Sequence, residues 1–142
     1  MKMVLDASVA LSWLLEDAGA NQDYAGKVFD ALASDGAEAR VPGIWGLEVA
    51  NGIAKCEARG ELMIERSQAF LAALAATPIA CDPETYGKAL TDTLQLSRHY
   101  RLSAYDASYL ELALRSQLPL ATLDVDLRAA ATKAGARPLQ VK

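Results

Sequence analysis

The sequence predicts an α/β protein with a three-layer α/β/α architecture around a central, mostly parallel sheet of five strands. Two observations favour this class. Short apolar segments alternate with longer segments of helical periodicity, which is the pattern of strands joined by helical crossovers. The predicted strands are apolar along their length, as expected for a parallel sheet covered on both faces. The chain of 142 residues fits one domain, 1–142, and 52% of its residues are hydrophobic, enough to form a core.

The elements follow from these patterns in order along the chain. Strands are predicted over residues 3–5, 39–41, 78–80, 118–122 and 138–141, the last at an edge because it contains a proline. Helices are predicted over residues 9–16, 24–33, 45–59, 64–75, 85–100, 105–116 and 125–134. Gly60 and Gly135 end two of these helices, since glycine favours the conformation at a helix C-terminus.

Composition excludes some classes of protein. The net charge of −4 argues against a strongly basic nucleic-acid-binding surface, but not against a nucleic-acid enzyme with a carboxylate site. Cys56 and Cys81 match no zinc-binding spacing, and both are predicted to be buried free thiols in a reducing compartment. No secretory signal opens the sequence, and no apolar segment reaches the length of a membrane span. We therefore expect a soluble, cytoplasmic protein.

Four acidic residues occupy corresponding places in the predicted fold. Asp6 follows the first strand and Asp124 the fourth, while Glu48 and Asp106 lie in the first turns of helices. Each alone is explained as a helix cap or as an acid that complements the helix dipole. Together, at one edge of a parallel sheet, they would repel one another unless protons or a cation neutralised them. Mg²⁺ or Mn²⁺ suits such an all-carboxylate site.

These acids lie in segments that resemble the motifs of a known family. Residues 4–9, 42–51, 103–107 and 120–124 resemble, in this order, the four acidic motifs of PIN-domain proteins. Their order, their spacing and the length of the chain resemble the VapC toxins of bacterial toxin–antitoxin pairs. The resemblance covers nearly the whole chain. It implies a PIN-like three-layer fold, a Mg²⁺ or Mn²⁺ centre and an endoribonuclease that leaves 5′-phosphate and 3′-hydroxyl ends. It also implies a VapB-type antitoxin partner and a homodimer.

The same resemblance assigns roles to the four acids. Asp6, Glu48 and Asp106 are the principal catalytic and metal-binding residues, and Asp124 is the fourth. Asp126 is a second candidate for the fourth position, but Asp124 is favoured because it follows the strand directly.

Several neighbours of these acids have two interpretations each. Ser8 and Thr122 either orient a carboxylate or a water, or are simple cap and strand-end hydroxyls. Asn51 and Lys55 follow Glu48 at helical spacings, although a solvated face is the favoured interpretation of Lys55.

Three further features of the sequence also have both a functional and a purely structural interpretation. The basic segment 98–101 either binds RNA phosphates or is a solvated helix end. The apolar stripe of residues 64–74 is predicted to be core, or else a dimer face. Trp13 and Trp45 are either core residues or the place where an antitoxin docks.

Two other functions remain possible at this point. A receiver-like signalling domain would share the parallel sheet and the acidic pocket, but usually has paired acids after the first strand and an Asp after the third. Here Asp6 stands alone after the first strand, and only Asp82 follows the third. A non-catalytic PIN-like binding module is the other alternative, although all four acidic positions are filled.

Overall fold

The computed structural model describes residues 1–15 and 19–142. The sheet consists of β1 (Lys2–Leu5), β2 (Glu38–Val41), β3 (Ile79–Cys81) and β4 (Leu120–Ala121). All neighbouring strands are parallel, and their order across the sheet is β3-β2-β1-β4. In the register of the central strand, Val4 lies opposite Arg40 of β2 and Leu120 of β4. The carboxyl ends of all four strands therefore point toward the same edge.

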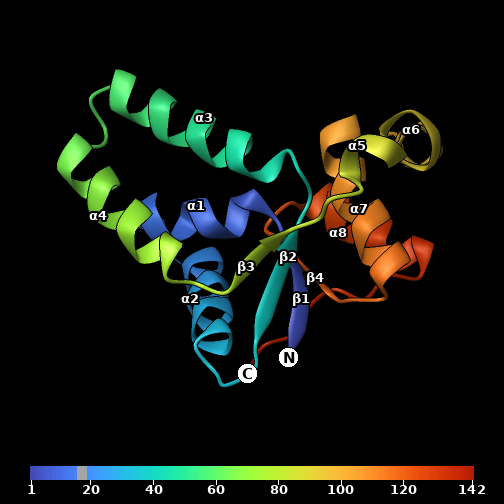
Figure 1. The fold of residues 1–142 in the computed structure, drawn as a ribbon, viewed down its shortest axis with the longest axis horizontal. Coiled ribbons are helices and arrows are strands. Elements are labelled where there is room, and N and C mark those ends of the chain that lie inside the picture. The colour runs from blue at the N-terminus through green and yellow to red at the C-terminus, as the bar shows by residue number, and fades with distance from the viewer. Residues whose placement is uncertain (16–18) are drawn as a thin grey trace.

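Helices cover both faces of the sheet. Figure 1 shows on one side α1 (Ala7–Leu15), α2 (Ala20–Leu32), α3 (Trp45–Ala58) and α4 (Ile64–Ala75). On the other side lie α5 (Thr85–Lys88), α6 (Leu94–Tyr100), α7 (Ala104–Ser116) and α8 (Val125–Ala134). The prediction of a three-layer α/β/α fold with a parallel sheet is confirmed. Glu16, the predicted end of the first helix, lies outside the described residues.

The predicted fifth strand is wrong. After Gly135 the described chain forms only an isolated parallel bridge between Pro138 and Leu120 of β4. The backbone N–H of Leu139 donates to the Leu120 carbonyl oxygen at 2.8 Å, and that of Leu120 donates to the Arg137 carbonyl oxygen at 2.8 Å. Pro138 has no N–H with which to extend the ladder. The described sheet therefore has four strands.

The segment predicted as one helix over residues 85–100 is divided by a π-helical turn. The turn, η1 (Ala89–Thr93), joins α5 to α6, and the Thr93 hydroxyl within it is buried without a hydrogen-bond partner among the described residues. A π-helical turn accommodates one extra residue in a helix. The helix then ends at Arg101, which adopts the left-handed conformation with φ of 57°.

The core lies between the sheet and its two helical layers. Met3, Val4 and Leu5 of β1 are fully buried, as are Tyr109 and Leu110 of α7. Burial of the central strand on both faces is what its continuous apolar sequence predicts. No described helix has the length and apolar character needed to cross a membrane.

Helix α3 packs closely on α1 at Gly52. A Cβ atom at this position would lie 2.7 Å from Leu11 Cδ1, closer than side chains pack, so glycine sets the distance between the two helices. Since α3 carries Glu48, this contact also contributes to the placement of that carboxylate.

The apolar stripe of residues 64–74 is only partly core. Phe70 and Leu74 pack against the core, while 59% of Ile64 and 42% of Leu71 are exposed. The prediction of a core helix holds for one face of α4 only, because alanine and leucine indicate helix formation without specifying what covers the helix. The alternative, that this face meets a partner, stays open.

Candidate active site

Two of the four predicted acids lie at the carboxyl ends of neighbouring strands. Asp6 directly follows β1, and Asp124 caps α8 shortly after β4. The two strands pair in parallel, with Leu5 opposite Ala121, and the backbone N–H of Asp6 donates to the Ala121 carbonyl oxygen at 2.9 Å. The strand pairing needed to bring Asp6 and Asp124 to one edge is therefore present.

The other two acids lie in the first turns of helices that start at this edge. Glu48 lies on α3 and Asp106 on α7, where the Ser103 hydroxyl caps the helix by accepting a hydrogen bond from the Asp106 N–H at 3.1 Å. Glu48 experiences the charges of Asp6 and Asp106. Asp106 experiences those of Asp124 and Asp6. The four carboxylates are thus within electrostatic range of one another, and we refer to them as the acidic cluster.

Asp6 is the most firmly held member of the acidic cluster. It is only 5% exposed, and its Oδ2 accepts hydrogen bonds from Ser8 Oγ at 2.6 Å and Thr122 Oγ1 at 2.8 Å. The same hydroxyl oxygens accept backbone N–H groups, from Leu123 to Ser8 at 3.1 Å and from Asp124 to Thr122 at 3.0 Å. Ser8 and Thr122 therefore orient the Asp6 carboxylate and tie the end of β1 to the start of α8.

The two carboxylate oxygens of Asp124 differ in their hydrogen bonds. Its Oδ1 accepts the backbone N–H of Leu127 at 2.8 Å, which makes it the N-cap of α8. Among the described residues no hydrogen bond reaches its Oδ2. Asp126, the second candidate for the fourth acid, is exposed and caps nothing. The choice of Asp124 over Asp126 stays a prediction.

Tyr109 is a site residue that the sequence analysis missed. Its hydroxyl donates to Glu48 Oε1 at 2.5 Å, although its side chain is fully buried. Burial raises the pKa of Tyr109 far above its ordinary value, and the hydrogen bond to Glu48 raises it further. The phenol therefore stays protonated and fixes one Glu48 oxygen. The sequence signal was its position one helical turn after Asp106, on the same face of α7.

Burial and mutual repulsion raise the pKa values of three members of the acidic cluster. Burial raises the pKa of Asp106, and the charges of Asp124 and Asp6 add to it, so that the value reaches about 6. Burial also raises the pKa of Glu48 and of Asp6, against the hydrogen bonds that each accepts. Such shifts mark a site whose negative charge lacks a counterion.

No cation of the described chain neutralises this charge. Among residues 1–15 and 19–142, the salt bridges involve other acids. No three His, Cys, Asp or Glu side chains of the described residues are already grouped closely enough to hold a metal. The donor set nevertheless consists of carboxylate oxygens with raised pKa values and a free oxygen on Asp124. This chemistry fits a hard divalent cation, which would draw the carboxylates together.

Comparison with known families identifies the fold that carries this site. The model of the PIN domain family matches residues 3–133. The chain belongs to the PIN domain family. A search of curated proteins finds no match.

Two solved structures share the fold of this PIN domain. The protein PAE2754 from Pyrobaculum aerophilum is 23% identical, with a TM-score of 0.63 over 92% of this chain and 87% of that one. A toxin–antitoxin complex from Klebsiella pneumoniae is 17% identical, with a TM-score of 0.56 over 86% of each chain. At sequence identities of 23% and 17%, the structural similarity supports the assignment of the fold alone.

A second group of carboxylates in the PIN domain is fully occupied by an arginine. Arg115 of α7 donates to Asp82 Oδ2 at 2.6 Å, to Glu84 Oε2 at 3.1 Å and to Glu111 Oε2 at 2.8 Å. We refer to these four residues as the Arg115 cluster. Asp82 follows β3, the position at which a receiver-like domain keeps an accessible acid. Since Asp82 is only 6% exposed and is bonded to Arg115, the structure gives no support to that alternative.

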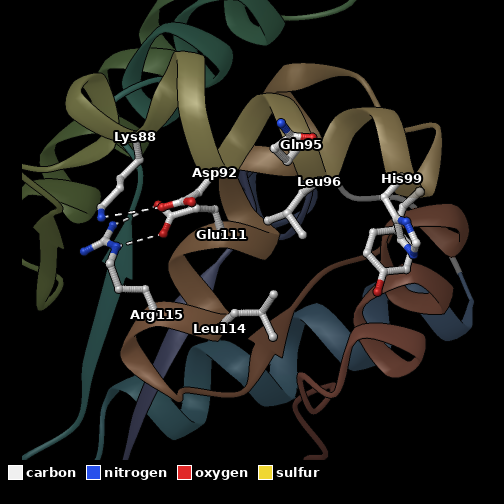
Figure 2. Close-up of a pocket in the computed structure, with 9 residues that line it drawn as sticks. Lys88, Asp92, Gln95, Leu96, His99, Glu111, Leu114 and Arg115 are labelled. Carbon is white, nitrogen blue, oxygen red and sulfur yellow. Dashed lines mark hydrogen bonds and ion pairs between the residues drawn. The ribbon is translucent and has the colours of Figure 1, made fainter.

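A large cavity in the described part of the PIN domain does not contain the acidic cluster. It has a volume of about 640 Å³ and lies between the helix that ends in α6 and helix α7. Figure 2 shows that its charged walls are paired, Lys88 with Asp92 and Arg115 with Glu111, while His99 lies at its opposite end. Because these charges are already satisfied, this cavity is a poor candidate for the chemistry.

The prediction for the two cysteines needs correction, whereas the burial of Trp45 agrees with one of its two interpretations. Cys81 is exposed and Cys56 half-buried, so neither is the buried thiol that its apolar neighbours suggested. Trp45 is core, at 9% exposed, and cannot anchor a partner. Trp13 is half-buried and donates to the Ala25 carbonyl oxygen at 2.7 Å.

The residues suggested around Glu48 contribute little to the site. Asn51 and Lys55 are exposed, and neither forms a hydrogen bond or ion pair within the described part of the chain. The solvated interpretation of Lys55 agrees with this position.

Proposed function

We propose that this PIN domain is a metal-dependent endoribonuclease whose acidic cluster binds Mg²⁺ or Mn²⁺. The observation that carries the proposal is the placement of four carboxylates at one edge of the sheet, with no salt bridge to any of them from residues 1–15 or 19–142. Burial raises the pKa of Asp106, and the charges of Asp124 and Asp6 raise it further, to about 6. A folded protein keeps such an arrangement at a loss of stability, which is typical of functional sites.

Asp6, Glu48, Asp106 and Asp124 would hold the ion. When bound, a divalent ion of this kind lowers the pKa of a water and stabilises negative charge on a phosphate. The remaining functions belong to the chain. Ser8 and Thr122 hold Asp6, and Tyr109 holds Glu48, so that neither carboxylate rotates away.

The overall reaction is hydrolysis of an RNA phosphodiester. The oxygen of water forms the new bond to phosphorus, the bond to the leaving 3′ oxygen breaks, and that oxygen takes up a proton. The products carry the 5′-phosphate and 3′-hydroxyl ends that the family resemblance implies. The hydroxyl groups beside the cluster, those of Ser8 and Thr122, both donate to Asp6, so we assign the attack to water and not to a side-chain nucleophile.

We further propose that the enzyme is a VapC-type toxin of the cytoplasm, inhibited by a VapB-type antitoxin. A structure of the same fold is a toxin–antitoxin complex from Klebsiella pneumoniae, which supports this role. An antitoxin Arg or Lys inserted into the acidic cluster would neutralise it and exclude the metal, since guanidinium pairs closely with carboxylates. Coexpression with the adjacent small gene, copurification and a nuclease assay test this part. A tight complex that cleaves RNA as fast as the free protein would contradict it.

A homodimer is the expected assembly. Tyr86 of α5 is 94% exposed and Leu90 of η1 is 84% exposed, with Leu47 of α3 at 68%. Large apolar side chains at such exposure favour association with a partner surface. Light scattering at tens of micromolar, on the order of a weak-dimer regime, should report a dimer. A monomer at this concentration would contradict the expectation.

The nuclease itself is tested by incubating purified protein with total RNA. We expect cleavage with Mg²⁺ or Mn²⁺ and none with EDTA. Absence of cleavage under every metal condition would favour the remaining alternative, a non-catalytic PIN-like binding module.

A further inference from the structure

A groove lies between the end of α6 and helix α8, beside the acidic cluster. Its volume is about 490 Å³. Tyr100 and Arg101 line it from the end of α6, and Ala129 and Lys133 line it from α8, with Asp126 at the first turn of α8. Charged side chains thus line the groove from both helices, with apolar and aromatic residues between them.

The groove continues into the acidic cluster. Asp126 lines the groove, and its charge also contributes to the raised pKa of Asp106. On the opposite wall only Leu102 separates Arg101 from Ser103, the residue that caps the helix bearing Asp106. A chain lying in the groove would therefore lead directly to the acidic cluster.

The cations of this groove are unpaired. Arg101 and Lys133 are exposed, and neither side chain forms a salt bridge or hydrogen bond within the described residues. The neighbouring cavity differs, because its Lys88 and Arg115 are bonded to acids of the chain (Figure 2). The two basic side chains of the groove are thus available to an anionic ligand.

The backbone conformation of Arg101 is one that usually favours glycine. At φ of 57° it is left-handed, a conformation that helix C-termini usually assign to glycine, as α8 does at Gly135. A side chain there strains the backbone. Gln117 at the end of α7 adopts the same conformation, with φ of 56°, so the strain alone assigns no function. Arg101 differs from Gln117 in that it lines the groove beside the acidic cluster.

We propose that this groove binds the sugar–phosphate backbone of single-stranded RNA next to the cleaved bond, with Arg101 and Lys133 contacting phosphates. The inference rests on the proposed ribonuclease function and adds the path of the substrate. Phosphate contacts from Arg101 and Lys133 would hold a backbone irrespective of its sequence. The acidic cluster repels RNA in the absence of metal, so cations beside it supply attraction where the strand approaches.

The test measures RNA binding in EDTA, separately from cleavage. The probe is a fluorescent oligouridylate of roughly 12 nucleotides, within the span of single-stranded sites. Arg101→Gln combined with Lys133→Gln should weaken binding roughly 10-fold at low salt. The dependence of log affinity on log salt should become shallower by about 1.4, since each phosphate contact on a single strand contributes about 0.7. The matched control removes two exposed charges on the other helical layer, Lys27→Gln with Arg59→Gln, and should bind as the wild type does.

A second variant separates binding from folding. Arg101→Gly relieves the left-handed strain, so Tm should rise by about 2–4 °C while RNA affinity falls. A merely structural role for Arg101 would not give opposite changes in stability and affinity.

The outcomes distinguish the groove from the nuclease. Equal binding by the groove variants and the control, or no RNA binding by the wild type, would overturn the groove. Metal-free binding that depends on Arg101 and Lys133, without cleavage in Mg²⁺ or Mn²⁺, would uphold the groove and overturn the ribonuclease. Cleavage in Mg²⁺ or Mn²⁺, together with metal-free RNA binding that the Arg101 and Lys133 substitutions leave unchanged, would uphold the ribonuclease and overturn the groove.

Discussion

The acidic cluster and the Arg115 cluster contain the same chemical groups in opposite electrostatic states. Both bring together carboxylates from the carboxyl edge of the sheet and from helix α7. In the Arg115 cluster one guanidinium bonds to three acids, and its hydrogen bond, with that of Thr85, outweighs burial and lowers the pKa of Asp82. In the acidic cluster no cation of the described chain is present, and the pKa of Asp106 rises to about 6.

We interpret this difference as one between carboxylates that serve the fold and carboxylates that are proposed to bind a ligand. A buried acid that is bonded to arginine is a structural element, because its charge is compensated within the chain. An acid held in place by hydroxyl groups alone keeps its charge for an external cation. The two clusters therefore provide matched variants, in which the same change of Asp or Glu to its amide has opposite expected effects.

The largest expected effect concerns activity. Asp6→Asn, Glu48→Gln and Asp106→Asn should each reduce RNA cleavage on the order of 100-fold or more, since the amide keeps the shape and loses the metal-binding charge. Circular dichroism should show that each variant is folded. Glu111→Gln in the Arg115 cluster is the control and should retain most of the activity. An equal loss in the control would mean that the comparison does not separate structure from function.

The second effect concerns stability. Asp82→Asn leaves Arg115 short of its main partner, whose side chain is 6% exposed, and should lower the free energy of unfolding by about 1–3 kcal/mol. Asp106→Asn removes repulsion and should leave stability unchanged or raised at pH 7 in EDTA. Urea denaturation measures both. Destabilisation by Asp106→Asn similar to that by Asp82→Asn would contradict the contrast.

The third effect is the dependence of stability on pH without metal. The folded pKa of Asp106, about 6, lies above the unfolded value of about 4, so the folded state binds the extra proton between these values. The raised pKa of Asp106 therefore stabilises the folded state below about pH 4, and this stabilisation is lost as pH rises through about 6. The lowered pKa of Asp82 has the opposite sign, and its contribution is lost as pH falls below about 4. Tm measured against pH in EDTA should show a slope between pH 4 and 6 that Asp106→Asn flattens and Asp82→Asn leaves intact.

The smallest expected effect separates the two candidates for the fourth acid. Asn at position 124 keeps the cap to Leu127, since an amide oxygen accepts the same hydrogen bond. Asp124→Asn should therefore remain folded and lose more cleavage activity than Asp126→Asn. The reverse order in the same RNA assay would assign the fourth position to Asp126.

The sequence predicted the parts of this molecule that depend on local pattern. Alternating strands and helices predicted the parallel three-layer fold, and the positions of the acids predicted that Asp6 and Asp124 follow neighbouring strands while Glu48 and Asp106 lie in first helical turns. A strand was predicted at Pro138, but the chain forms only an isolated bridge there. An apolar sequence does not reveal whether its backbone N–H groups find hydrogen-bond partners.

The sequence pattern did not predict side-chain contacts between segments that are distant along the chain. The bond from Tyr109 to Glu48 joins α7 to α3, and that from Arg115 to Asp82 joins α7 to the end of β3. Both depend on how the helices pack, which periodicity does not specify. The exposure of Cys81 and Ile64 has the same origin, since a residue's own type does not fix what covers it.

The most direct test of the central claim is Mn²⁺ binding measured by calorimetry on the wild type, Asp6→Asn and Glu111→Gln. The account predicts a site in the wild type, a similar affinity in Glu111→Gln, and an affinity at least about 10–100-fold weaker in Asp6→Asn. Unchanged binding in Asp6→Asn, or equal loss in both variants, would contradict the claim that the acidic cluster is the metal site.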